Sequence, residues 1–299
     1  MEIRVPASSA NLGPGFDVLS LALRLYCFFD IEESGSGHDD LSVDGEGAIE
    51  ITSSKSNLVK LSYEFVCKKN SIRPKPLNIK IFNQIPVGKG MGSSSTAIVA
   101  GAVYANETNR LGLGRMEIAA IASEIEGHPD NVSAAVFGGL CVSVSDSECS
   151  YYSHNHMVDD EVTVLMLVPD NSQSTHEARR VLPQMISMKS AIFNMSRTSL
   201  LVSSFIKGDY SFLKQLMEDR IHQKARYALY PRSRALMEEL KRIGKCACAI
   251  SGAGPAVICI QVDSLERCED DIFDIINRDF KDFKLIRTKV DNEGFKIKG

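Results

Sequence analysis

A glycine-rich segment in the first third of the chain constrains the fold more than any other feature of the sequence. The alternating apolar residues of 77–82 predict a strand before it, and the small and apolar residues of 96–106 predict a helix after it. A glycine turn leading from a strand into a helix exposes backbone N–H groups to an anion, and the helix dipole favours negative charge there. The sequence therefore predicts a phosphate site formed by Pro86, Val87, Gly88, Lys89, Gly90, Met91, Gly92, Ser93, Ser94 and Ser95.

This segment matches neither of two common nucleotide-binding loops. It lacks the Gly-Lys-Ser/Thr end of a Walker A loop, and Ser93 stands where a Gly-x-Gly-x-x-Gly dinucleotide loop has its third glycine. Its three consecutive serines can donate to phosphate oxygens or hold a metal ion bound to them. A flexible turn capped by serines would have the same composition, so the pattern alone leaves that alternative open.

A second cluster of chemically capable residues follows the predicted helix 116–126. Glu126 lies in the last turn of that helix, where a carboxylate could complete a Mg²⁺ site, because magnesium takes one or two protein oxygens together with phosphates. Gly127 ends the helix, and Asp130 or Asn131 could equally act as an N-cap for a helix at 132–137. His128 alone is more typical of a structural or exposed histidine.

A third glycine motif and two arginines complete the set of candidates. Gly252, Ala253 and Gly254 lie between two apolar strands, where glycine permits a tight turn or a close approach to a ligand. A plain hairpin turn explains this motif equally well. Arg179 and Arg226 can bind carboxylates or phosphates with two hydrogen bonds each, but surface arginines are common.

The remaining pattern predicts strands and helices in both halves of the chain, which favours an α/β or α+β fold. Residues 6–17 are rich in turn formers and contain no convincing strand or helix. The polar stretch 145–160 is the predicted boundary, which gives domains 1–152 and 153–299. Strands are predicted at 3–5, 21–32, 162–168, 246–250, 257–262 and 283–290, and helices at 57–69, within 177–240 and at 266–277.

Composition excludes several classes of protein. The 38 acidic and 34 basic side chains give a net charge of −4, without the basic excess of a nucleic-acid-binding protein. The sequence contains no run of about 20 apolar residues, the length that a membrane helix requires. The start of the sequence does not resemble a signal peptide. The eight cysteines form no Cys-x-x-Cys pair, which favours reduced, mostly buried thiols in a cytoplasmic protein.

The order of the motifs resembles the GHMP kinase family. Residues 6–17, 86–95 and 251–255 are similar to its first, second and third motifs, and residues 124–132 resemble the members that phosphorylate L-homoserine. The resemblance implies an α+β protein with two domains. The N-terminal, ATP-binding domain would be of the ribosomal-protein βαβ type and the C-terminal domain ferredoxin-like, with syn ATP between them.

The resemblance also implies a role for each candidate residue. Ser94 and Glu126 match the Mg²⁺ ligands, Asn11 and Asp17 the residues that receive the substrate ammonium, and Arg179 and Arg226 those that bind its carboxylate. His128, Asp130 and Asn131 would lie near the substrate hydroxyl. Met91 and Thr96 depart from the family pattern without removing a backbone donor, and Ala256 stands where a serine or threonine would place a hydroxyl near the phosphates.

The implied activity is transfer of the ATP γ-phosphate to the hydroxyl of L-homoserine, a step of threonine biosynthesis, in a cytoplasmic protein that forms a homodimer. Asn131 stands where other family members have an aspartate base, so we expect catalysis without an obligatory carboxylate base, with Asp130 as the alternative base. Two alternatives stay open: another GHMP kinase of the mevalonate-pathway or shikimate type, and a non-catalytic ligand sensor.

Overall fold

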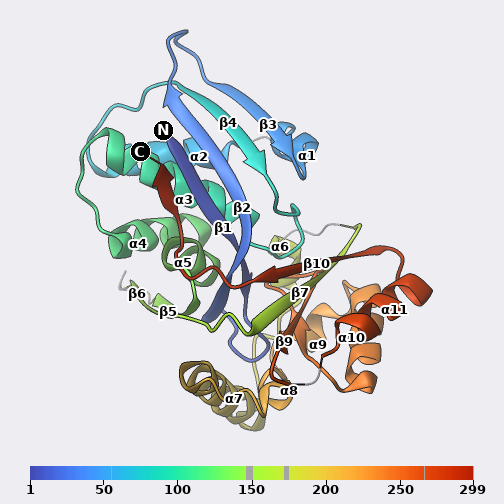
Figure 1. The fold of residues 1–299 in the computed structure, drawn as a ribbon. Coiled ribbons are helices and arrows are strands. Elements are labelled where there is room, and N and C mark those ends of the chain that lie inside the picture. The colour runs from blue at the N-terminus through green and yellow to red at the C-terminus, as the bar shows by residue number, and fades with distance from the viewer. Residues whose placement is uncertain (55, 146–150, 172–174, 266, 299) are drawn as a thin grey trace.

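The computed structural model describes residues 1–54, 56–145, 151–171, 175–265 and 267–298. Figure 1 shows two β-sheets, each covered by helices, and the two chain ends side by side. This arrangement confirms the expected α+β class. The part of the polar stretch at 146–150, including Cys149, lies outside the described residues.

The first sheet contains seven strands. Its main path runs β11-β1-β2-β4-β3, and β5 pairs with β2 and β6. All neighbours are antiparallel except β3 and β4, which run parallel and are joined through helices. The strands are β1 (Glu2–Ala10), β2 (Leu19–Glu33), β3 (Asp40–Gly45), β4 (Leu77–Asn83), β5 (Leu140–Ser145), β6 (Tyr151–His156) and β11 (Lys296–Lys298).

Four helices of the first half pack together beside this sheet, and α1 (Ala48–Thr52) lies apart from them against β3 (Figure 1). The four are α2 (Leu58–Lys69), α3 (Ser93–Thr108), α4 (Arg115–Glu126) and α5 (Asp130–Phe137). Helix α3 is buried along most of its length because its residues are small or apolar. Gly101 permits its close approach to α2, since a Cβ there would lie 2.2 Å from the Val59 carbonyl oxygen. This packing holds the start of α3 in place.

The second sheet has the strand order β10-β7-β9-β8, and all neighbours are antiparallel. With the intervening helices this is the βαββαβ order of a ferredoxin-like unit. The strands are β7 (Val162–Pro169), β8 (Ala247–Ile250), β9 (Val257–Val262) and β10 (Phe283–Lys289). The helices are α6 (Thr175–Arg180), α7 (Met188–Lys207), α8 (Leu213–Leu216), α9 (Gln223–Arg226), α10 (Pro231–Ile243) and α11 (Glu269–Asp279).

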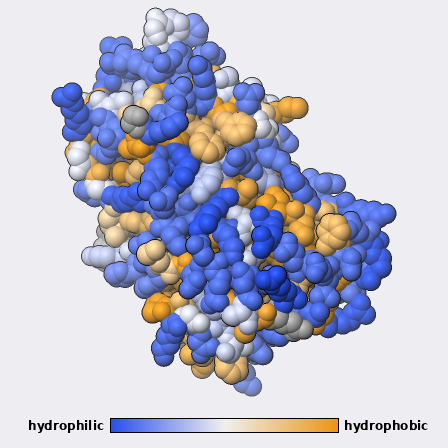
Figure 2. Space-filling model, viewed as in Figure 1, coloured by the Kyte–Doolittle hydropathy of each residue, from blue (hydrophilic) through white to orange (hydrophobic). Residues whose placement is uncertain are grey.

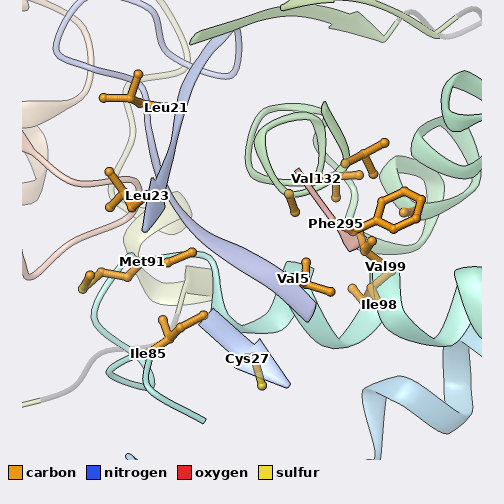
Figure 3. Packing of buried hydrophobic residues seen from close by; sticks show 14 of the residues in the cluster. Val5, Leu21, Leu23, Cys27, Ile85, Met91, Ile98, Val99, Val132 and Phe295 are labelled. Atoms are coloured by element: carbon orange, nitrogen blue, oxygen red, sulfur yellow. The ribbon is translucent and has the colours of Figure 1, made fainter. Parts of the chain in front are cut away.

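One hydrophobic core joins the two sheets. Val5, Leu21 and Val99 from the first half belong to the same buried cluster as Met166 and Ile258 from the second sheet. Figure 3 shows part of this cluster around β1, β2 and α3. A separate cluster on the other side of the second sheet is covered by α10 and α11. The two halves therefore present a continuous apolar interface to each other.

The described helices include none that is both long and apolar enough to cross a membrane. The surface is mostly hydrophilic in the view of Figure 2, with an apolar patch over β2 and β4. Phe28 and Phe82 are exposed there, with ring centroids 6.1 Å apart.

The expectation of no strand within residues 6–17 is wrong. Strand β1 continues to Ala10 and pairs with β2 along its length, with a register shift between Pro6 and Ala7. Ser8 and Ser9 are fully buried, so both faces of this strand end are covered and the apolar–polar alternation of a half-exposed strand is missing.

The expected boundary after residue 152 falls within β6, which pairs with β5 in the first sheet. Residues 296–298 also return to that sheet and pair with β1. We propose that the change of domain lies between β6 and β7, and that the C-terminal strand belongs to the N-terminal domain.

Candidate active site

A cavity of about 340 Å³ brings the predicted residues of both halves together. The glycine-rich segment forms one part of its wall and the predicted substrate residues another. The lining includes Asn11, Asp17, Pro86, Val87, Gly88, Gly90, Met91, Gly92, Ser93, Ser94, Glu126, His128, Asp130, Asn131, Arg179, Arg226, Gly252 and Ala253. Lys89, Ser95 and Gly254, also predicted as site residues, are not among the lining residues.

The glycine-rich loop enters helix α3 through left-handed backbone. Gly88, Gly90 and Gly92 have φ of 68°, 77° and 72°, a conformation that other residues rarely adopt. Gly92 is the N-cap of α3, so the first N–H groups of the helix have no partner within the helix. These donors and the positive end of the helix dipole make this side of the cavity suited to phosphate.

The predicted loop residues outside the lining have structural roles of their own. Lys89 Nζ donates to the carbonyl oxygen of Asp170 at 2.6 Å. Ser95 is fully buried, and its Oγ has no hydrogen-bond partner among the described residues. The expected row of three serines therefore presents only Ser93 and Ser94 to the cavity.

The third glycine motif packs directly on the loop. Ser251 Oγ donates to the Gly90 carbonyl oxygen at 2.7 Å, and Ala256 N donates to the Lys89 carbonyl oxygen at 3.1 Å. A Cβ at Gly90 would lie 2.2 Å from the Ser251 carbonyl oxygen, so only glycine allows this approach. The motif thus braces the loop, in addition to lining the cavity through Gly252 and Ala253.

Ser94 and Glu126 meet at the same side of the cavity. Ser94 lies in the first turn of α3 and Glu126 in the last turn of α4, and Ser94 Oγ donates to Glu126 Oε1 at 2.6 Å. A hydroxyl and a carboxylate oxygen beside a phosphate site are hard donors of the kind Mg²⁺ prefers. The chemistry of this donor pair fits a magnesium ion.

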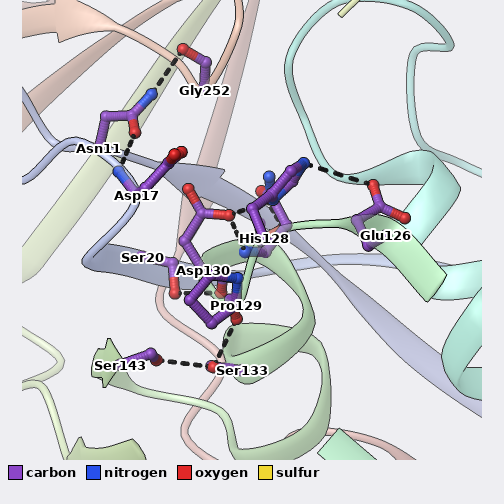
Figure 4. A network of polar contacts seen from close by, with 12 residues as sticks. Asn11, Asp17, Ser20, Glu126, His128, Pro129, Asp130, Ser133, Ser143 and Gly252 are labelled. Carbon is purple, nitrogen blue, oxygen red and sulfur yellow. Dashed lines mark hydrogen bonds and ion pairs between the residues drawn. The ribbon is translucent and has the colours of Figure 1, made fainter. Parts of the chain in front are cut away.

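His128 and Asp130 contact each other next to Glu126 (Figure 4), and Asp130 also contacts the backbone of Asn131. Asp130 Oδ1 lies 2.6 Å from His128 Nδ1 and accepts from the Asn131 N–H at 2.7 Å. Burial disfavours the charged imidazole, but the hydrogen bond and charge of Asp130 outweigh it, so the pKa of His128 is raised. Asp130 is therefore occupied by local partners.

The Asn131 side chain is oriented by a residue that the sequence did not single out. Ser8 Oγ donates to Asn131 Oδ1 at 2.8 Å, which directs the donor end of the amide away from Ser8. Gly92 leaves room for this contact, because a Cβ there would lie 2.0 Å from Ser8 Oγ. The sequence did not predict that Ser8 lies buried on β1, because the end of this strand lacks the apolar–polar alternation of a half-exposed strand.

Asn11 and Asp17 lie in a tight turn with left-handed backbone, at φ of 72° and 56°. Asn11 Oδ1 accepts from the Asp17 N–H at 3.1 Å, and Asn11 Nδ2 donates to the Gly252 carbonyl oxygen at 2.8 Å (Figure 4). Such conformations persist where surrounding contacts enforce them, and they concentrate at functional sites.

Two arginines from the second half face this turn. Arg179 Nη1 and Nη2 donate to the two carboxylate oxygens of Asp17, at 3.0 and 2.8 Å. Arg226 is 2% exposed and donates through Nη1 to the Gly252 carbonyl oxygen at 2.7 Å. Both guanidinium groups lie near the ring of Phe16, at 5.7 and 5.4 Å from its centroid. The acid and both cations therefore border one end of the cavity.

A neutral histidine supports Arg226. Burial lowers the pKa of His222, whose Nδ1 lies 3.1 Å from Arg226 Nη1 and whose Nε2 lies 2.8 Å from the Gly13 carbonyl oxygen. With the proton on Nε2, the ring donates to Gly13 and accepts from Arg226. This fixes the guanidinium without placing a second positive charge beside it.

Sequence reasoning missed the apolar end of the cavity. Phe29, Leu41, Ile51, Leu58 and Val59 line it, together with polar residues such as Asn57. Asn57 was predicted only as the N-cap of α2, a role it fills by accepting from the Lys60 N–H at 3.1 Å. No local pattern marks these positions, because strands β2 and β3 and the start of α2 meet only in the folded chain.

Comparison of this chain with known proteins identifies the family to which it belongs. The chain matches the N terminal domain of GHMP kinases over residues 57–139 and their C terminal domain over residues 201–266. It is 40% identical to the homoserine kinase of Caldanaerobacter subterraneus subsp. tengcongensis over 298 residues, which is 99% of this chain and 95% of that protein. The chain belongs to the homoserine kinase family of GHMP kinases. It is accordingly an ATP-dependent kinase that phosphorylates a hydroxyl group.

Further relatives agree with this membership in the homoserine kinase family. The homoserine kinase of Clostridium beijerinckii is 35% identical over 99% of this chain and 97% of its own length. The crystal structure of homoserine kinase from Cytophaga hutchinsonii has a TM-score of 0.82 at 22% identity, and covers 99% of this chain and 96% of that one. At that identity the structural likeness shows the fold, which is the GHMP fold expected from the motif order.

Proposed function

We propose that the protein transfers the γ-phosphate of ATP to the hydroxyl of L-homoserine, giving O-phospho-L-homoserine for threonine biosynthesis. The observation that carries this proposal is the meeting of Asp17 with Arg179 and Arg226 in the cavity that also contains the glycine-rich loop. Homoserine has a positive ammonium, a negative carboxylate and a terminal hydroxyl. A carboxylate for one end and arginines for the other would hold it by both charges.

The phosphates of ATP would lie on the loop at 86–95. The N–H groups at the start of α3 and the hydroxyl of Ser93 can donate to phosphate oxygens. The apolar end around Phe29 and Val59 suits the adenine base. ATP would in this way extend along the cavity toward the charged end.

Ser94 and Glu126 would hold Mg²⁺ against these phosphates. When bound, the ion neutralises charge that develops on the transferring phosphoryl group. In the free protein the Ser94 hydroxyl donates to Glu126, so it must turn toward the cavity to offer its lone pair.

Asn131 would position the substrate hydroxyl. Its amide is oriented by Ser8, and it lies next to Asp130 at the start of α5. Phosphoryl transfer depends mainly on positioning and charge stabilisation, so an amide can suffice here. Asp130 is engaged by His128 and by the Asn131 N–H, which makes it the less accessible base.

An ADP-release assay with Mg²⁺, ATP and several alcohols tests the proposed activity. We expect turnover with L-homoserine, and a phosphorylated product identified by mass spectrometry. Mevalonate and shikimate are the matched alternative acceptors. Turnover with either of these but not with homoserine would exclude the proposed substrate, and ligand binding without any turnover would indicate a sensor.

We also propose a cytoplasmic homodimer. The described cysteines are free thiols, as is usual in the cytoplasm, and helix α7 exposes Met188, Ile192 and Met195 at helical spacing. Light scattering should give twice the monomer mass, and Ile192→Glu should reduce it to that of a monomer.

A further inference from the structure

Three cysteine thiols meet in the second sheet, away from the kinase cavity. Cys246 precedes β8, Cys248 lies within it, and Cys259 lies on β9 directly opposite Cys248. Their sulfur atoms are 3.3 Å apart for Cys246 and Cys248, and 2.8 Å apart for Cys248 and Cys259. We call these three residues the thiol cluster.

The strand pattern explains why the thiol cluster forms. Cys246 and Cys248 are two residues apart and therefore point to the same face of the strand. That face packs under α10 and α11, whereas the intervening Ala247 belongs to the core on the other side. Cys268, the N-cap of α11, is buried in the same hydrophobic core as Cys246 and Cys259, and its thiol interacts with that of Cys246.

The thiol cluster differs from the other cysteines. Cys27, Cys67 and Cys141 are buried free thiols that belong to no such group in the described residues. In the thiol cluster all three sulfur atoms lie within 4.8 Å of one another. Thiolates in close groups are soft ligands that select ions such as Zn²⁺.

We propose that Cys246, Cys248 and Cys259 bind a Zn²⁺ ion, with Cys268 as the candidate fourth ligand. Zinc lies about 2.3 Å from each thiolate in a tetrahedral site, which puts the sulfur atoms about 3.8 Å apart. The Cys246–Cys248 and Cys248–Cys259 separations would have to widen by about 0.5 and 1.0 Å, which rotations of the three side chains can supply. Each thiol would lose its proton to solvent when the metal binds.

A separate cavity of about 780 Å³ gives the ion a route to the thiol cluster, because Cys246 and Cys248 line its wall. Three thiolates on a divalent cation carry a net charge of −1, and four carry −2. Basic side chains outnumber acidic ones around this cavity: Lys214, Arg220, Lys224, Arg234 and Lys241 against Glu218, Asp219 and Glu238. The surroundings thus suit a negatively charged metal–thiolate group.

The proposed ion is structural. None of the four cysteines lines the kinase cavity, so the metal would connect β8, β9 and the start of α11 without touching the reacting groups. Binding to the folded state alone raises stability by mass action. Removal of zinc is therefore expected to lower the melting temperature while kcat measured with Mg²⁺ stays the same.

Cobalt titration of the full-length reduced protein tests the site. We expect one equivalent of Co²⁺ to bind with a thiolate-to-cobalt charge-transfer absorption, and Zn²⁺ to displace it. Cys248→Ser and Cys259→Ser should each weaken this absorption, because one thiolate is removed, and should bind Co²⁺ at least tenfold less tightly. Cys141→Ser is the matched control, because Cys141 is also a buried strand cysteine but lies in the first sheet.

Several results would overturn the proposal. One is the absence of a charge-transfer band in the folded wild-type protein, and another is an unchanged band in folded Cys248→Ser. If the serine variants fail to fold, the wild-type protein decides alone: purified with reductant, it should contain one zinc by elemental analysis and lose thermal stability with a chelator. A Cys248–Cys259 disulfide in the isolated protein, with no metal bound after reduction, would identify a redox pair instead.

Discussion

Arg179 and Asp17 hold each other with two hydrogen bonds, at 2.8 and 3.0 Å, across the two halves of the chain. In the proposed complex, each of these groups would instead bind the opposite charge of the zwitterionic substrate. The proposed binding mode would separate the pair and replace it with two new ion pairs.

Arg179→Ala should weaken substrate binding far more than it weakens the fold. The side chains of Arg179 and Asp17 are 36% and 31% exposed, and such ion pairs contribute about 0–1 kcal/mol to stability. A hydrogen-bonded charge pair to the substrate contributes about 1.5–3 kcal/mol, so KM for homoserine should rise about 10- to 150-fold. KM for ATP should stay unchanged. Equal increases in both constants would contradict the assignment to the substrate.

Asn131→Ala should lower kcat about 100-fold by mispositioning the hydroxyl, with little change in either KM. Ser8→Ala is a milder variant that acts on the same amide, because it removes only the hydrogen bond that orients the Asn131 side chain. We expect it to reduce kcat by a smaller factor. Steady-state kinetics of both variants checks this, and a larger effect in Asp130→Asn, with both KM values intact, would move the catalytic role to Asp130.

Glu126→Gln should raise the Mg²⁺ concentration required for half-maximal activity. The amide keeps the size of the side chain but removes the negative charge that attracts the ion. Magnesium titrations at saturating ATP measure this shift. Glu124→Gln is the control, because Glu124 is exposed on the same helix and pairs with Lys69. An equal shift in both variants would exclude Glu126 as a ligand.

Gly90→Ala should damage both the fold and the nucleotide site. Gly112 has a similar φ of 71°, but a Cβ added there would meet nothing within 4 Å, so Gly112→Ala isolates backbone strain of about 1–2 kcal/mol. Gly90→Ala adds a clash with the Ser251 carbonyl oxygen, 2.2 Å from the new Cβ. Its loss of unfolding free energy should exceed that of the control, and KM for ATP should rise only in Gly90→Ala.

His128 should make stability depend on pH. Its pKa is raised above the usual 6.5, because the hydrogen bond and charge of Asp130 outweigh burial. The folded state therefore binds the proton more tightly than the unfolded state. The resulting stabilisation is fully present below pH 6.5 and is lost as the pH rises through the folded pKa. The unfolding free energies of wild type and His128→Gln should differ most at low pH and should converge above the folded-state pKa of His128. A difference that stays constant with pH would contradict the predicted pKa shift.

The sequence predicted the elements that are locally encoded. The strand at 77–82 and the helices at 57–69 and 116–126 agree with β4, α2 and α4, because their apolar spacing survives in the fold. Strand β1 beyond Val5 was missed because buried serines replace the expected alternation. The return of residues 296–298 to β1 is a long-range pairing that no local pattern records.

The residues of the candidate site also differ in whether the sequence could predict them. The glycine loop and the Glu126–Asn131 cluster were predicted because each is contiguous in sequence. The family resemblance predicted Asp17 and Arg179 as residues of one site, but the hydrogen bonds between them, 162 positions apart, were not predicted. Ser8 and the apolar end of the cavity could not be predicted, because they acquire a role only through packing.

The most direct measurement compares kcat/KM for L-homoserine with that for two truncated acceptors. 3-Aminopropan-1-ol lacks the carboxylate and 4-hydroxybutyrate lacks the ammonium, but both keep the hydroxyl. A hydrogen bond between charged groups contributes about 1.5–3 kcal/mol, so the absence of either charged group should lower kcat/KM about 10- to 150-fold. We predict losses of that size for both analogues. Similar kcat/KM values for all three acceptors would contradict recognition by Asp17, Arg179 and Arg226.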